Sequence, residues 1–170
     1  MHHANNVIRA LLSLTAIFWL GTATALPNDK DQPVEIEADS VDIDEGKGTS
    51  IYQGSVELTQ GTIRLKADKV TVFQRGSKPS RILAEGRPVQ FRQLESKEKG
   101  YITGKAQRAE YQLSSEELVL IGDAVLTQGK DSFQSDRIVY DRVRAKLKAG
   151  AAAKGKQRVK ITIGNPNSAQ

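Results

Sequence analysis

The chain has 170 residues, of which 38% are hydrophobic, 5% aromatic and 26% charged, with a formal net charge of +5. This length suits one domain, and so many charges exclude a protein with several membrane spans. Cysteine is absent, which excludes disulfides, thiol catalysis and cysteine-ligated zinc. Apolar residues recur along most of the chain, which argues against intrinsic disorder.

The first 25 residues have the composition of a secretory signal peptide. Arg9 is followed by an apolar run over 10–20 and by small residues up to Ala25. The run is too short to span a membrane, and the order basic, apolar, small is typical of an exported leader. We expect 1–25 to be cleaved off before Leu26. An uncleaved anchor at the membrane surface is the alternative.

Beyond this leader the chain contains no His, Cys, Trp or Met. It therefore lacks the residues of a Ser-His-Asp triad, a Cys-His pair or a histidine-ligated metal site. A calcium-like spacing that begins at Asp42 has Gln53 in place of the final glutamate, which favours a simple turn. Acidic pairs at Glu95/Glu98 and 116–117 have the chemistry of glycosidase carboxylates, but no aromatic residues flank them to hold a sugar. We expect no metal, no cofactor and no enzymatic activity.

Apolar and polar residues alternate along much of the remaining chain. This is the pattern of antiparallel strands with one buried face and one face in water. Glycines between the runs are placed for turns and bulges, and no run has a convincing helical period. The alternating runs are 34–37, 55–59, 62–66, 69–73, 89–92, 110–113 and 160–163.

One sequence unit occurs twice. The residues GSVELTQG of 54–61 return as GDAVLTQG over 122–129. Each copy is followed by a short strand and by a D-[KR]-[VI] element, at 68–70 and at 136–138. The chain therefore consists of several hairpin-like units, whose apolar faces must close around a common interior. A long open roll lined by Val, Ile and Leu suits these repeats and could hold acyl chains. A compact β-sandwich fits the periodicity at least as well.

The two ends of such a roll are strand edges, formed by 34–37 and by 158–163. Exposed edges add strands from partners unless they are blocked. Two different edges that meet head to tail give an open filament. Alternatively, Lys160 and the polar tail over 164–170, which we expect to be disordered, protect the last edge.

Basic residues are concentrated near the C-terminus. Eight of them lie from Arg142 to Lys160 without an intervening acidic residue. From Arg142 to Lys148 they alternate with apolar residues, which predicts a strand with one basic face. A solvated face explains this pattern, and contact with the phosphates of a lipid head group is the alternative. Nucleic acid is not expected, because no aromatic residues are interleaved to stack on bases.

Several motifs in fixed order resemble one known family. DQPVEIEAD at 31–39 is followed by LTQGTI at 58–63, ADKV at 67–70 and GRP at 86–88, and KGKQRV stands near the end. In these motifs the chain resembles the OstA-like family, the LptA-like lipopolysaccharide-transport proteins of the Gram-negative periplasm. The resemblance covers residues 26–163.

The resemblance implies an all-β domain, a twisted and slightly open antiparallel β-jellyroll with an apolar interior. It implies a periplasmic carrier without enzymatic activity, whose groove holds the acyl chains of lipid A. It also implies a head-to-tail homo-oligomer that bridges the inner and outer membranes, with LptC at the N-terminal edge and LptD at the C-terminal edge. A self-assembling β-roll scaffold that binds only protein partners is the alternative function, and a carboxylate-based polysaccharide-active enzyme is a third.

The inward positions of the alternating runs are our candidate lipid-binding residues. They are Val34, Ile36, Val56, Leu58, Ile63, Leu65, Val70, Val72, Val89, Phe91, Tyr111, Leu113, Leu126, Phe133 and Ile138. The candidate partner-binding edges are Val34, Glu35 and Ile36 at one end and Arg158, Val159, Lys160, Ile161 and Ile163 at the other.

Overall fold

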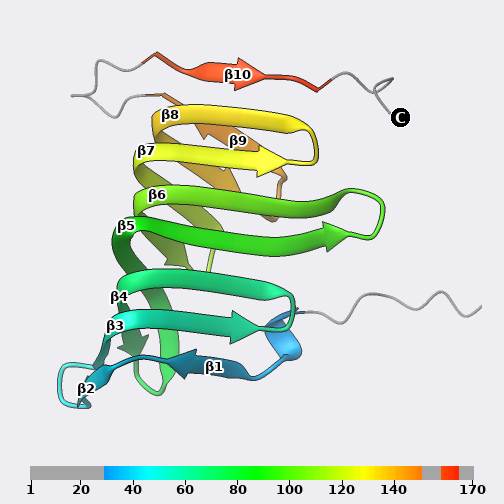
Figure 1. Ribbon diagram of the computed structural model, residues 1–170. Helices are drawn as coiled ribbons and strands as arrows, with labels where there is room; N and C mark the ends of the chain where they lie inside the picture. Colours follow the sequence, from blue (N-terminus) through cyan, green and yellow to red (C-terminus); the bar gives the residue numbers. More distant parts are fainter. Residues whose placement is uncertain (1–28, 151–157, 165–170) are drawn as a thin grey trace, which may run out of the picture.

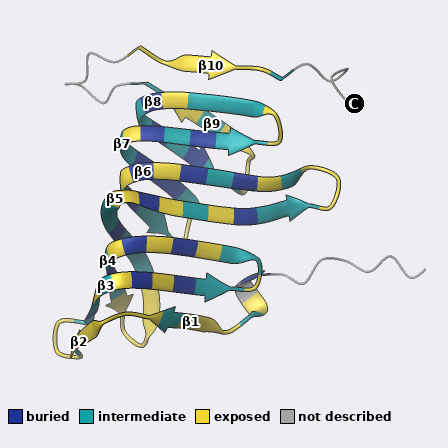
Figure 2. Ribbon diagram, viewed as in Figure 1, coloured by how far each residue is buried: buried dark blue, intermediate teal, exposed yellow. Residues whose placement is uncertain are grey.

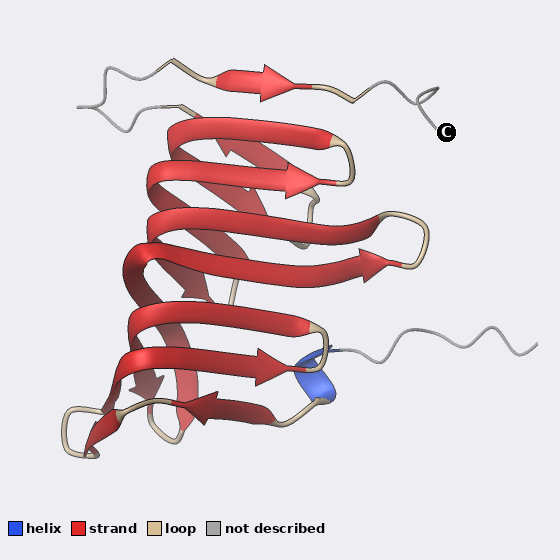
Figure 3. Ribbon diagram, viewed as in Figure 1, coloured by secondary structure: helices blue, strands red, loops and turns tan. Residues whose placement is uncertain are grey.

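The alternating runs form ten antiparallel strands in the computed structural model, which describes residues 29–150 and 158–164 (Figures 1 and 3). The predicted all-β class and the open antiparallel β-jellyroll are confirmed. The expected leader over 1–25, its cleavage site and residues 165–170 of the expected tail lie outside the described residues.

The strands form one sheet in the order β1-β3-β4-β5-β6-β7-β8-β10, with β2 also paired to β3 and β9 also paired to β8. A 3₁₀ turn, η1, precedes the first strand. The bounds are η1 Asp29–Asp31, β1 Val34–Glu37, β2 Ser40–Asp44, β3 Thr49–Gln60, β4 Ile63–Arg75, β5 Lys78–Ser96, β6 Gly100–Gln112, β7 Glu117–Gln128, β8 Asp131–Asp141, β9 Lys146–Ala149 and β10 Lys160–Thr162.

Each long strand bends near its middle, so that its two halves lie in two facing layers (Figure 1). The bends coincide with shifts in strand register, for example between Gln53 and Val56 and between Ile121 and Ala124. Such bulges sharpen the local bend of a strand. Because they recur from strand to strand, the single sheet folds over along one line and encloses an interior.

The repeated sequence unit forms these bends. Gly54 and Gly122 have φ values of 82° and 77°, and the residue after each also has a positive φ. A Cβ atom on Gly54 would lie 2.1 Å from Oδ2 of Asp39, and one on Gly122 would lie 2.8 Å from Oε1 of Gln107. Both the left-handed backbone and the close neighbour therefore require glycine.

The interior is lined by rows of side chains that run across the sheet. Figure 2 shows the resulting alternation of buried and exposed residues along the strands. One row crosses the layer formed by the second halves of β3, β5 and β7. In order of pairing it consists of Ile36, Leu58, Leu65, Phe91, Gly104, Leu126, Phe133 and Ile161.

The two layers are packed together around β6 to β8 and are separated towards β1 and β2. A Cβ atom on Gly104 would lie 3.1 Å from Cδ1 of Leu120, and Leu120 is only 1% exposed. At the other end of the sheet, Val34, Val41 and Ile43 are 53%, 56% and 60% exposed. The interior is therefore filled on one side and open on the other.

Two expectations about exposure were wrong. Thr71 was expected on the wet face but is only 8% exposed, because it pairs between Ile51 and Leu83 on the outer face of the sheet. The basic strand expected from residue 142 begins only at Lys146, because 142–145 form a turn. Val143, expected on the apolar face of that strand, lies in the turn and is 70% exposed.

Candidate functional site

An apolar groove lies between the two layers on the side of β1 to β6. Its cavity has a volume of about 440 Å³, within the range of sites that bind small molecules. Its wall is mainly aliphatic and aromatic, with a few polar groups near the strand ends. Such a surface favours a ligand with extended hydrocarbon, because each buried CH₂ stabilises a complex by about 0.8 kcal/mol.

Nine of the fifteen candidate lipid-binding residues are brought together on this wall. They are Val34, Ile36, Leu58, Ile63, Leu65, Val72, Phe91, Tyr111 and Leu113. The other six belong to the packed core. Val56, Val70, Val89, Leu126 and Ile138 are each at most 1% exposed, and Phe133 is partly buried against them.

Several residues of the wall were not predicted from the sequence. Ile82 and Ala84 lie on it, but they belong to the segment RILAE of 81–85, which does not alternate cleanly. Tyr52 and Ala109 also line it. Tyr52 pairs with Val70, which the alternation did identify, whereas Ala109 pairs with Ala84 and Leu120, which it did not. The remaining wall residues that were not predicted are Ser50, Gln60, Gln74, Pro79, Leu118 and Arg142.

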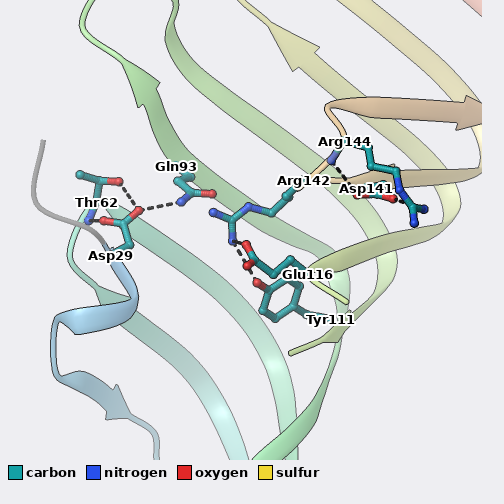
Figure 4. A network of polar contacts seen from close by, with 8 residues as sticks. All are labelled: Asp29, Thr62, Gln93, Tyr111, Glu116, Asp141, Arg142 and Arg144. Atoms are coloured by element: carbon teal, nitrogen blue, oxygen red, sulfur yellow. Dashed lines mark hydrogen bonds and ion pairs between the residues drawn. The ribbon is translucent and has the colours of Figure 1, made fainter. Parts of the chain in front are cut away.

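Arg142 adds a charge to the groove wall, and Figure 4 shows it beside Tyr111 and Glu116. It follows β8, and its backbone N–H donates to the carbonyl of Glu116 at 3.2 Å. Its Nη1 donates to the hydroxyl of Tyr111 at 3.0 Å and lies 4.0 Å from Oε2 of Glu116. The neighbouring Arg144 instead pairs with Asp141 at 3.1 Å. The two arginines of this turn therefore have different surroundings.

Polar contacts form around Glu95, on the packed side of the molecule. Its carboxylate accepts hydrogen bonds from Lys99 at 2.7 Å and from Gln128 at 2.5 Å. Burial raises the pKa of Glu95, but these hydrogen bonds outweigh burial and hold that pKa below its ordinary value. Burial raises the pKa of Tyr140 above its ordinary value, and the nearby charge of Glu95 raises it further. Glu95 lies in β5 and Tyr140 in β8, so the charge of Glu95 acts on a residue of a distant strand.

A buried carboxylate holds the N-terminal segment against the turn between β3 and β4. Asp29, which is 8% exposed, accepts hydrogen bonds from Oγ1 of Thr62 at 2.8 Å and from Nε2 of Gln93 at 2.7 Å (Figure 4). Gln60 also donates to the carbonyl of Gln32 at 3.2 Å. These contacts fix the position from which β1 brings Val34 to the groove.

The acidic motif that begins at Asp42 spans the end of β2 and the turn that leads to β3. Oδ1 of Asp44 accepts a hydrogen bond from the Lys47 backbone at 2.9 Å, and its Oδ2 lies 2.7 Å from Nζ of Lys47. Within 29–150 and 158–164, no group of three or more acidic, His or Cys residues could hold a metal. The same described part of the chain has no helix long and apolar enough to cross a membrane.

The outer faces of the two sheet ends carry opposite charges. Following the strand register across the whole sheet, the outward row that begins at Asp42 in β2 ends at Lys148 in β9. The row that begins at Glu37 in β1 ends at Lys160 in β10. The β1–β2 end is therefore acidic and the β9–β10 end basic.

The fold and the groove define a class of protein: an open antiparallel β-jellyroll with an accessible apolar interior. The family model described as "LptA/(LptD N-terminal domain) LPS transport protein" matches residues 35–146. The chain belongs to this family of lipopolysaccharide-transport proteins.

Several named relatives agree with this assignment. The lipopolysaccharide export system protein LptH of Pseudomonas aeruginosa is 30% identical over 148 residues, which are 86% of this chain and 85% of that protein. The lipopolysaccharide export system protein LptA of Escherichia coli K12 is 32% identical over 143 residues, 83% of this chain and 76% of that one. The crystal structure of P. aeruginosa LptH, a periplasmic component of its lipopolysaccharide transport device, matches with a TM-score of 0.76 at 28% identity. That match covers 82% of this chain and all of that one.

Proposed function

We propose that this protein is a non-enzymatic periplasmic carrier of lipopolysaccharide, which holds the acyl chains of lipid A in the groove between its layers. The observation that carries the proposal is the apolar groove wall, which reaches the edge strand β1 at Val34 and Ile36. A lipid with several acyl chains cannot cross water unaided, because each methylene gains about 0.8 kcal/mol on leaving water. A groove that accepts the chains while the sugars stay outside removes this barrier.

Loading would require the groove to widen. The cavity of about 440 Å³ has the volume of a site for a drug-sized molecule. Lipid A is larger than such a molecule. The layers are least packed beside β1 and β2, where Val41 and Ile43 are more than half exposed. We therefore place the entry of the acyl chains at this end of the sheet.

The two sheet ends support assembly into a bridge between the membranes. A copy that stacked its β9–β10 end on the β1–β2 end of the next would bring Lys148 towards Asp42 and Lys160 towards Glu37. Unlike ends that join in this way form an open filament and not a closed dimer. In this proposal the N-terminal edge meets LptC, the C-terminal edge meets LptD, and further copies lie between them for outer-membrane assembly.

Export is part of the same proposal. The segment 1–25 would direct the chain to the periplasm and be removed between Ala25 and Leu26. The N-terminal sequence of the protein isolated from the periplasmic fraction is expected to begin at Leu26.

Photo-crosslinking in cells tests the carrier function. A photoreactive residue at Phe91, on the groove wall, is expected to give a lipopolysaccharide adduct. The control is Lys69, which lies beside Glu85 in a depression at the bend of the sheet and not on that wall. No adduct at Phe91, in a protein that still assembles, would favour the scaffold that binds only protein partners.

A further inference from the structure

Arg142 is the one fully charged side chain on the groove wall within the described part of the chain. Its side chain is 20% exposed, so that most of it has left water. Burying a guanidinium is costly unless hydrogen bonds and an opposite charge compensate it. An otherwise uncharged wall therefore carries one cation. The contacts that Arg142 makes determine what it can bind.

The contacts of Arg142 compensate its charge only loosely. Its hydrogen bond to Tyr111, at 3.0 Å, uses a neutral hydroxyl, and its Cζ lies 5.9 Å from the centroid of that ring. The carboxylate of Glu116 is 4.0 Å from Nη1, which is too long for a hydrogen bond. A ligand anion could therefore approach the guanidinium more closely than Glu116 does.

The position of Arg142 matches an amphiphile whose chains lie in the groove. Tyr111 has its ring on the same wall and its hydroxyl on the guanidinium. Apolar contact and positive charge therefore meet at one point of the groove wall. The planar guanidinium presents paired N–H donors that suit phosphate oxygens.

We infer that Arg142 binds a phosphate monoester on the head group of the glycolipid whose acyl chains occupy the groove. This inference rests on the proposed function and assigns a head-group contact to that site. Glu116 partly balances the guanidinium from 4.0 Å, and a bound phosphate would take over this role. Free inorganic phosphate has the same chemistry but lacks the chains.

Binding assays with purified full-length mature protein test this assignment. The probes are bisphosphorylated lipid A, the same lipid A without its phosphates, and inorganic phosphate. Arg142→Gln is expected to weaken binding of bisphosphorylated lipid A about 10-fold to 100-fold, the usual size of a lost charged hydrogen bond. Binding of the dephosphorylated lipid should not change. Arg142→Lys, which keeps the charge but loses the paired donors, should give a smaller loss that is also specific to the phosphorylated lipid.

Two further variants complete the comparison: one is expected to tighten binding, and the other is a control that should not change it. Glu116→Gln should tighten binding of the phosphorylated lipid, because it removes a carboxylate that competes with the phosphate. Arg144→Gln, in the same turn but off the groove wall, should bind both lipids as the unmodified protein does. Inorganic phosphate at millimolar concentration should not displace the bound lipid.

Each contrary result has its own meaning. Equal losses for both lipids in the Arg142 variants, or no loss for either, would overturn the inference and leave the carrier function standing. Displacement of the lipid by inorganic phosphate would show a site for free phosphate and would overturn the head-group assignment. If the unmodified protein bound neither lipid, the proposed function would fail, and the inference would fail with it.

Discussion

The backbone N–H of Thr62 donates to Oδ1 of Asp29 at 2.6 Å, across 33 positions of sequence. The contact is close because Gly61 leaves room for it: a Cβ atom on Gly61 would lie 2.3 Å from the same oxygen. Three donors, two from Thr62 and one from Gln93, converge on this one carboxylate. The start of the described chain is thereby fixed to the turn that follows β3.

We expect Asp29→Ala to lower the free energy of unfolding by about 2 kcal/mol, because it leaves buried donors without their acceptor. It should also speed hydrogen exchange of the β1 amides more than those of β5 and β6. Urea unfolding and native-state exchange measure the two effects. The exposed neighbour Asp31→Ala is the control, and an equal effect of both variants would show that the carboxylate of Asp29 is no anchor.

Gly104 and Leu120 define how closely the two layers approach. Gly104→Leu is expected to cost about 1–3 kcal/mol of unfolding free energy, because its side chain enters space held by Leu120. Leu120→Ala is expected to cost about 2–5 kcal/mol, because it leaves a cavity. The double variant should be more stable than the sum of the two losses predicts. Strict additivity in urea unfolding would mean that these residues do not meet.

The low pKa of Glu95 predicts how stability depends on pH. Because hydrogen bonds favour its ionised form in the folded protein, its contribution is complete above the ordinary carboxyl range. That contribution is lost as the pH falls through the lowered folded-state pKa. Below about pH 4.5 the unmodified protein should therefore lose stability more steeply than Glu95→Gln. Thermal unfolding across that range measures both slopes, and identical slopes would contradict the assignment.

Replacing glycine by alanine is expected to lower the free energy of unfolding by different amounts at Gly122 and Gly100, although their backbones are similar. Gly122 and Gly100 have φ values of 77° and 75°, but only the former has a neighbour within reach, Gln107. Gly100→Ala should cost about 1 kcal/mol from backbone strain alone. Gly122→Ala should cost more, about 2–3 kcal/mol, because the new Cβ also displaces Gln107. Equal losses in thermal unfolding would show that the contact is unimportant.

Opposite charges at the sheet ends predict how copies associate. Lys148→Glu and Asp42→Lys are each expected to weaken self-association about fivefold to tenfold at low salt. A mixture of the two variants should recover it, because each reversed charge then meets its complement in the other variant. Light scattering against concentration measures this. No recovery in the mixture, with both variants folded, would exclude pairing of Lys148 in one copy with Asp42 in the next.

The alternation of residue types was sufficient to predict the strands, because each strand has one face in the interior. It left an open roll and a compact sandwich equally open, and only the family resemblance implied the roll. The alternation could not predict where the interior is filled and where it is open. That difference depends on contacts across layers, such as Leu120 opposite Gly104, which lie on different strands. Thr71 and Arg142 were misplaced for a related reason. Their burial and partners are set by neighbouring strands and turns, not by the residues beside them in sequence.

The charge rows also give the molecule a polarity. Asp42 and Glu37 mark one end, and Lys148 and Lys160 mark the other. Each junction between unlike ends covers one acidic end and one basic end. A stack of any length therefore keeps one acidic end and one basic end exposed. In the bridge proposed above, a partner at either membrane would therefore meet the same surface whether one copy or many lie between them, and the number of copies would follow the distance to be spanned.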